Sequence, residues 1–131
     1  MPFPADEARI EEAERELGRR LPTELRERLM RDNGGEITAV PLREDQHANF
    51  EPDWELHPVW DDSDRRRAAR TASHIVRELD QARSWPGFPE GAIPFASNGT
   101  ADRLVVTADS DDLMYWDHEQ GGTFRVRIRW D

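Results

Sequence analysis

Residues 124–130 read Phe-Arg-Val-Arg-Ile-Arg-Trp, and this stretch decides the fold class more directly than any other. Apolar residues alternate with arginines along it, which is the period of two that a β-strand with one buried face requires. Three shorter apolar runs precede it, and turns at Asn98-Gly99 and Gly121-Gly122 follow two of them. We therefore expect strands at residues 93–96, 104–107, 113–117 and 124–130.

The amino-terminal part of the chain has the spacing of helices instead. Ile10 and Leu17 lie on one helical face before Gly18, a residue that commonly ends a helix. A second helix is expected to begin at Pro22, because proline is favourable in the first turn. Asn33-Gly34-Gly35 then provides residues able to take positive φ where that helix ends.

The middle of the chain predicts a strand, an irregular connection and a third helix. Residues 37–40 are a short strand candidate, and residues 41–58 mix Pro, Asp, Asn and His in a way typical of an irregular connection. The third helix is expected from about residue 61, with Ser63 as its N-cap and an apolar stripe that ends at Leu79.

Helices followed by strands with short turns indicate an α+β fold. A chain of 131 residues normally forms one domain. We expect a single domain over residues 1–131, with a largely antiparallel β-sheet and helices packed on one side.

Composition excludes several kinds of chemistry. The chain contains no cysteine and no lysine, and its 18 basic residues are all arginine. Schiff-base catalysis, a phosphate-binding loop lysine, a thiol nucleophile and a disulfide are therefore excluded. A formal net charge of −10 also disfavours direct binding of nucleic acid, because phosphate contacts require clustered cations.

The amino end shows no signal peptide pattern, and no run of residues approaches the roughly 20 apolar positions that a membrane-spanning helix needs. We expect a soluble, cytoplasmic protein.

The excess negative charge is concentrated in two segments. Residues 36–62 carry a net charge of −7 and residues 85–120 carry −6, whereas residues 63–84 between them carry +3. Carboxylates around large aromatic residues suit an interface with a desolvated centre and a rim that attracts a basic partner. The alternative is that the acids only keep the protein dispersed. If the two segments converge, the expected partner-binding residues are Asp53, Trp54, Glu55, Trp60, Asp61, Asp62, Asp109, Asp111, Asp112 and Tyr115.

Other conspicuous residues have competing interpretations. Asp117-His118-Glu119 offers ligand types for zinc or manganese, but successive strand residues point to opposite faces, which favours a structural role. Ser97 and His118 could be paired as in a hydrolase, but no nucleophile-elbow pattern surrounds the serine. The arginines of residues 124–130 could bind an anion or RNA, or could pair with carboxylates of a neighbouring strand. We expect no catalytic residue, no metal and no cofactor.

Four sequence features together resemble the SUKH superfamily, over about residues 10–119. They are the helix from Leu21-Pro22 to Asn33-Gly34-Gly35, the segment Phe88-Pro89-Glu90-Gly91-Ala92-Ile93-Pro94-Phe95-Ala96, the turn at residues 98–102, and Trp116-Asp117-His118-Glu119. Two features depart from that pattern. Ala101 precedes Asp102 where the family usually has glycine, and the chain is expected to finish with a strand where many members have a helix.

The resemblance implies a binding protein without catalytic residues. The superfamily includes bacterial immunity proteins that neutralise a cognate toxin, often a nuclease, and a fungal regulator of cell-wall synthesis. The first of these implies an immunity protein that neutralises a cognate toxin, and the acidic segments of this chain indicate that the toxin is a basic domain such as a nuclease. The second leaves a regulatory scaffold as the alternative.

Overall fold

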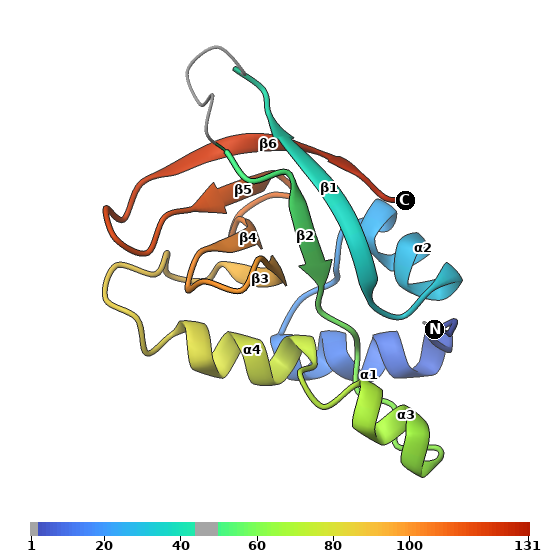
Figure 1. Cartoon of the computed structure of the whole chain (residues 1–131). Helices are drawn as coiled ribbons and strands as arrows, with labels where there is room; N and C mark the ends of the chain where they lie inside the picture. Colours follow the sequence, from blue (N-terminus) through green and yellow to red (C-terminus); the bar gives the residue numbers. More distant parts are fainter. Residues whose placement is uncertain (1–2, 44–49) are drawn as a thin grey trace.

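The computed structural model describes residues 3–43 and 50–131. Within these ranges the chain forms four helices and six strands (Figure 1). The helices are α1 (Glu7–Leu17), α2 (Thr23–Arg31), α3 (Arg65–Arg70) and α4 (Ile75–Ala82). The strands are β1 (Gly35–Pro41), β2 (Asp53–Leu56), β3 (Ile93–Ser97), β4 (Arg103–Val106), β5 (Leu113–Trp116) and β6 (Thr123–Arg129).

The strands form one antiparallel sheet that closes into a barrel. Each strand pairs with the next one in chain order, and β1 also pairs with β6. Closure is possible because the first half of β1 pairs with β2, whereas its second half, from Thr38 to Pro41, pairs with β6. The α+β class and the antiparallel sheet expected from the sequence are confirmed, and closure adds a contact between strands far apart in the chain.

The strand expected at residues 124–130 is confirmed as β6, one residue earlier at each end. Val126 is buried, and the arginines at residues 125, 127 and 129 are exposed, as the alternation predicts. Arg125 forms an ion pair of 2.9 Å with Asp112, the residue before β5. This contact agrees with the interpretation in which a β6 arginine pairs with a carboxylate beside the neighbouring strand.

The third expected helix is divided into α3 and α4. Thr71 and His74 cause the break. The Thr71 hydroxyl donates to the carbonyl oxygens of Arg67 and Asp61, and it accepts from the Asp61 N–H at 3.0 Å. His74 is extended (φ −73, ψ 163) and begins α4 as its N-cap. The prediction of Ser63 as the N-cap is also wrong, because the Asp64 side chain accepts the capping hydrogen bond from the Arg67 N–H.

One strand lies inside the segment expected to be irregular. β2 alternates exposed Asp53 and Glu55 with buried Trp54 and Leu56. Its four residues are too few for the pattern to stand out between Pro52 and Pro58. Residues 44–49 of the expected connection lie outside the described residues.

The core lies inside the barrel and between the barrel and the helices. Ile10, Leu25 and Ile75 from the helices are fully buried in one cluster with Phe95 and Leu104 from the strands. Figure 1 shows α1 and α4 side by side at one side of the strands, with α4 against β3. No helix in the described ranges combines the length and the apolar character that a membrane span needs.

Gly91 lies two residues before β3 and packs closely against Ala108, so substituting it tests whether this contact limits the size of the residue. Its φ is +76°, and a β-carbon at this position would lie 2.7 Å from the β-carbon of Ala108. Gly99 also has a positive φ, of +90°, but an added β-carbon there meets nothing within 4 Å. Gly99→Ala should cost about 1 kcal/mol of unfolding free energy through backbone strain alone. Gly91→Ala should cost about 1–3 kcal/mol more, because of the collision. Equal losses in urea denaturation would contradict this account.

Candidate interaction surface

The predicted carboxylates of the two acidic segments lie toward opposite ends of β4 (Arg103–Val106). Glu55 of β2 pairs with Ser97 of β3, and Ser97 pairs with Arg103, the first residue of β4. The predicted carboxylates of the second segment, Asp109, Asp111 and Asp112, follow Val106, the last residue of β4. The structure therefore does not bring the predicted contact residues together into one surface.

The aromatic residues expected at the centre of that surface are largely internal. The Trp54 side chain is 1% exposed, because the alternation of β2 turns it into the barrel, where it packs against Phe50 and Tyr115. Tyr115 is partly buried, and its hydroxyl group donates to Asp102. Trp60 alone among the three predicted aromatics remains accessible, at 36%. Trp54 is thus a core residue and cannot contact a partner without unfolding.

Four of the predicted carboxylates already have partners within the chain. Asp61 is buried, and its carboxylate accepts a hydrogen bond from the Ser63 N–H at 3.0 Å. Burial alone would raise the pKa of Asp61, but the hydrogen bonds from Ser63 and the nearby arginine charges outweigh burial and lower it. The other three form ion pairs: Asp62 with Arg9 at 2.9 Å, Asp111 with Arg19 at 2.6 Å and Asp112 with Arg125 at 2.9 Å. Asp109 is exposed.

A different set of carboxylates gathers on the outer side of β1 and β2. Glu36 of β1 lies directly opposite Glu55 of β2, and Asp53 lies opposite Thr38. All three carboxylates are exposed, and none is ion-paired with another residue of the described ranges. Like charges directly opposite each other across two strands are destabilising, so this arrangement does not serve the stability of the sheet.

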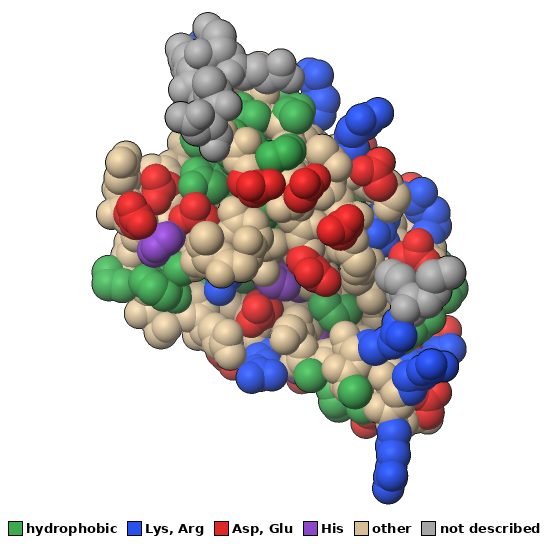
Figure 2. All heavy atoms as spheres, viewed as in Figure 1, with side chains coloured by type: hydrophobic (Ala, Val, Ile, Leu, Met, Phe, Trp, Pro, Cys, Tyr) green, Lys and Arg blue, Asp and Glu red, His purple; other side chains and the backbone are tan. Residues whose placement is uncertain are grey.

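These carboxylates line a groove of about 810 Å³, which we call the acidic groove. Ser97, Asn98 and Gly99, from the end of β3 and the turn that follows it, form another part of its lining. The end of α3 and the segment between α3 and α4 contribute as well, and Arg70 is the one arginine among the described residues of the lining. Figure 2 shows acidic side chains gathered on this face of the molecule. Of the predicted contact residues, Asp53 and Glu55 line this groove with exposed side chains, whereas Trp54 lines it but has its side chain buried.

His57, directly after β2, also lines the acidic groove and is 3% exposed. Its N–H donates to the Phe95 carbonyl at 2.8 Å, whereas its side-chain Nε2 has no hydrogen-bond partner among the described residues. Burial, with a smaller contribution from the charge of Arg103, lowers the pKa of His57 to about 3. The imidazole is therefore neutral near pH 7 and adds no positive charge to the groove.

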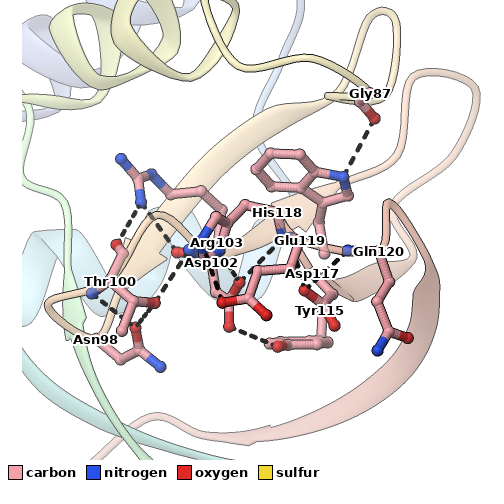
Figure 3. A network of polar contacts seen from close by, with 11 residues as sticks. Gly87, Asn98, Thr100, Asp102, Arg103, Tyr115, Asp117, His118, Glu119 and Gln120 are labelled. Atoms are coloured by element: carbon pink, nitrogen blue, oxygen red, sulfur yellow. Dashed lines mark hydrogen bonds and ion pairs between the residues drawn. The ribbon is translucent and has the colours of Figure 1, made fainter.

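A polar network holds the turn between β3 and β4 beside this groove (Figure 3). The Asp102 carboxylate accepts from the Tyr115 hydroxyl at 2.6 Å and from the His118 N–H at 3.0 Å. It also contacts His118 Nδ1 at 2.5 Å. Burial would raise the pKa of Asp102, but the hydrogen bonds from Tyr115 and His118 outweigh it and lower the pKa. Burial and the Asp102 charge raise the pKa of Tyr115 above its usual range.

The network joins the turn at residues 98–102 to Trp116-Asp117-His118-Glu119, two of the segments that carried the SUKH resemblance. The SMI1/KNR4 family model, SUKH-1, matches residues 4–127. The chain belongs to this family. Searches of curated proteins and of solved structures give no match. SUKH-1 membership supports a general role in toxin immunity or as a regulatory scaffold, and both roles require a protein partner.

The two departures from the SUKH pattern have structural explanations. No non-glycine residue within the described ranges has a positive φ, so Ala101 adopts an ordinary conformation, and Gly99 provides the positive φ of this turn. The chain also ends with a strand, because β6 pairs with both β5 and β1.

The contacts of this network also test the metal-site and hydrolase interpretations, because both interpretations involve His118. Asp102, Asp117 and His118 offer ligand atoms within 4.8 Å of one another, so the group that converges includes a residue from a distant turn. Both Asp102 oxygens already accept hydrogen bonds, and a metal on His118 Nδ1 would replace one of these contacts. His118 Nδ1 contacts Asp102, and no hydrogen bond links it to Ser97 within the described residues. The contacts favour a structural role for this cluster.

Glu36 and His57 line the acidic groove but were not predicted from the sequence as residues of a contact surface. Glu36 precedes the apolar run at residues 37–40, and extending the alternation by one residue would have placed it on the outer face. His57 had no comparable signal, because its burial depends on the position of Phe95 and Arg103.

Asp102→Asn should lower the unfolding free energy by about 2–4 kcal/mol, because a neutral amide accepts these hydrogen bonds less well and brings two donors of its own. The change is measured by urea denaturation at pH 7. Asp109→Asn, at an exposed carboxylate, is the matched control and should stay within about 0.5 kcal/mol of wild type. A loss no larger than that of the control would contradict the assigned role of Asp102.

The low pKa of the buried His57 side chain predicts how the free energy of unfolding changes with pH. Its pKa is about 3 when folded and 6.5 in a model compound, so below pH 6.5 the unfolded state takes up a proton that the folded state excludes. Stability is therefore lost as the pH falls from about 6.5 toward 3. Between pH 6.5 and pH 5, wild type should lose about 1.5 kcal/mol more than His57→Phe. Parallel declines of the two proteins would rule out this coupling.

Proposed function

We propose that this SUKH-1 protein is a bacterial immunity protein that binds and neutralises a cognate cytotoxic domain. The partner is a basic toxin, a nuclease, and the acidic groove is the surface that contacts it. The protein acts without catalysis, in the cytoplasm of the cell that it protects.

The observation that supports this proposal is the set of carboxylates on β1 and β2 that have no ion-pair partner in the part of the chain that the structure describes. Glu36, Asp53 and Glu55 are exposed on one face, whereas Asp62, Asp111 and Asp112 are neutralised by arginines. Because Glu36 and Glu55 repel each other across the strands, their placement has a cost in stability. A basic partner would remove that repulsion on binding.

A nuclease suits such a surface for a physical reason. Its substrate is a polyanion, so its active site must be rich in cations. An acidic protein surface competes for the same cations and covers the channel that leads to the scissile phosphate. Long-range attraction also accelerates encounter, to about 10⁸–10⁹ M⁻¹s⁻¹ at low salt. A complete interface would bury about 1,600 Å², so the groove would be its centre and the neighbouring turns its rim.

The titratable groups support a role in binding over a role in catalysis. His57 is held neutral by burial, with no hydroxyl group or carboxylate bonded to its ring among the described residues. His118 is occupied by Asp102. Neither histidine has the pairing with a nucleophile that acyl or phosphoryl transfer requires.

The alternative function is a regulatory scaffold that joins cellular proteins without neutralising a toxin. The family includes both roles, so co-expression separates them. The protein is expressed together with candidate toxin genes taken from the neighbourhood of its own gene, and growth and co-purification are measured. Rescue of growth with a stable complex is expected, whereas a complex without rescue would favour the scaffold.

Neutralising the groove should slow association with the toxin. Glu36→Gln, Asp53→Asn and Glu55→Gln together should reduce the association rate about 10-fold at low salt and change the dissociation rate much less. Surface plasmon resonance at several salt concentrations measures both rates.

A control with the same change in net charge isolates the position of these acids. Glu11→Gln, Glu16→Gln and Asp109→Asn together also remove three exposed carboxylates, but none of these residues lines the groove. The control should associate at nearly the wild-type rate. Equal slowing in both triple variants would mean that net charge alone matters, and would refute the groove as the contact surface.

A further inference from the structure

Trp85 lies in the loop between α4 and β3, and its side chain is 41% exposed. The loop is held firmly in place. The backbone N–H of Trp85 donates to the Ala82 carbonyl at 3.0 Å. The Gly87 carbonyl accepts from the indole N–H of Trp116 at 3.2 Å. The Phe88 ring also packs edge-on against Trp116, which is fully buried. Trp85 is therefore an exposed aromatic side chain on a loop with a fixed conformation.

The Trp85 ring stands against the ring of His118, with 5.2 Å between the ring centroids and an interplanar angle of 75°. Asp102 fixes the orientation of His118 in turn, through its contact with Nδ1. Glu119 follows directly, with one carboxylate oxygen 3.9 Å from His118 Nε2 and a side chain that is 77% exposed. An exposed indole and an exposed carboxylate thus flank the same imidazole ring.

This site adjoins the acidic groove. The turn after β3 contributes Asn98 and Gly99 to the groove on one side, and Asp102 from the same turn holds His118 on the other. Figure 3 shows Asn98, Asp102, His118 and Glu119 close together in one view. The turn at residues 98–102 therefore lies between the groove and the pair of His118 and Trp85, and a partner that covers the groove and this turn also contacts Trp85.

We propose that Trp85 and Glu119 form a binding site for an arginine side chain of the basic protein partner. The guanidinium group stacks on the indole ring while its N–H groups donate to the Glu119 carboxylate. This inference rests on the proposed function, and it adds the residue type that the partner presents and the place where that residue binds.

The chemistry of arginine fits both halves of the site. Its guanidinium is planar, weakly hydrated and rich in donors, whereas the lysine ammonium is compact and strongly hydrated. Tryptophan gives the strongest cation–π contact of the aromatic side chains. Tryptophan and arginine are also enriched among the residues that dominate binding energy. Within the described part of the chain, no arginine lies over the Trp85 ring.

Trp60 is a matched control within the same chain. It is 36% exposed and also lies beside a histidine, with its ring 5.5 Å from that of His74. Its neighbouring carboxylates are occupied, because Asp61 is buried and Asp62 pairs with Arg9. Trp60 thus has the aromatic half of the proposed site without a free carboxylate.

The test is a titration of the full chain with tri-arginine amide, observed by the NMR signals of the indole N–H groups. Trp85→Phe and Trp60→Phe assign the two exposed indoles. The Trp85 signal should shift progressively, at least three times as far as the Trp60 signal, and tri-lysine amide should bind several-fold more weakly. An unmoved Trp85 signal, equal shifts at Trp60 and Trp85, or equal binding of the two peptides would overturn the proposal.

Glu119→Gln tests the carboxylate without disturbing the fold, because this side chain is largely exposed. It should weaken tri-arginine binding several-fold, whereas Glu90→Gln, an exposed acid in the same loop as Trp85, should leave it unchanged. Equal binding by both variants would overturn the role of Glu119. If the growth rescue described above succeeds while these titrations fail, this inference falls and the proposed function stands. If arginine binds at Trp85 without any rescue, the proposed function falls instead.

Discussion

The interaction on which the rest of this surface depends is the acceptance of three hydrogen bonds by the Asp102 carboxylate. Its donors are the Tyr115 hydroxyl, the His118 N–H and the His118 ring, so one turn is tied both to β5 and to the segment after β5. Hydrogen bonds to an ionised acceptor are shorter and stronger than neutral ones. The same turn lines the acidic groove and positions His118 against Trp85, so a single partly buried charge orders both parts of the candidate contact surface.

The acidic residues of the protein fall into two physical classes. Those beside arginines form ion pairs: Asp111 links its turn to the loop after α1 through Arg19, and Asp112 links the same turn to β6 through Arg125. Glu36 and Glu55 face each other across two strands, and neither forms an ion pair with an arginine of residues 3–43 or 50–131. Repulsion of this kind lowers stability and raises the attraction of the surface for a basic partner. The distribution of ion-pair partners, more than the net charge, distinguishes the proposed binding surface from the rest of the described residues.

Local patterns in the sequence predicted much of the fold and little of the contact surface. The alternation at residues 124–130 identified β6, and Gly18 identified the end of α1, because both signals depend only on nearby residues. Barrel closure depends on pairing between Thr38 and Arg129, and the break between α3 and α4 depends on a hydrogen bond from Asp61 to Thr71. Such contacts join distant residues and leave no local pattern. For the same reason, the sequence placed Trp54 at an interface, although the alternation of β2 turns it inward.

The most direct test of the proposed contact surface is hydrogen exchange of the protein alone and in complex with a toxin that it neutralises in the co-expression experiment. The account predicts slower exchange on binding in β2, in the turn at residues 98–102 and at residues 117–120. It also predicts no change in the turn at residues 107–112, which lies at the other end of β4. Protection confined to residues 107–112, with β2 and the turn at residues 98–102 unchanged, would contradict the central claim that the acidic groove contacts the partner.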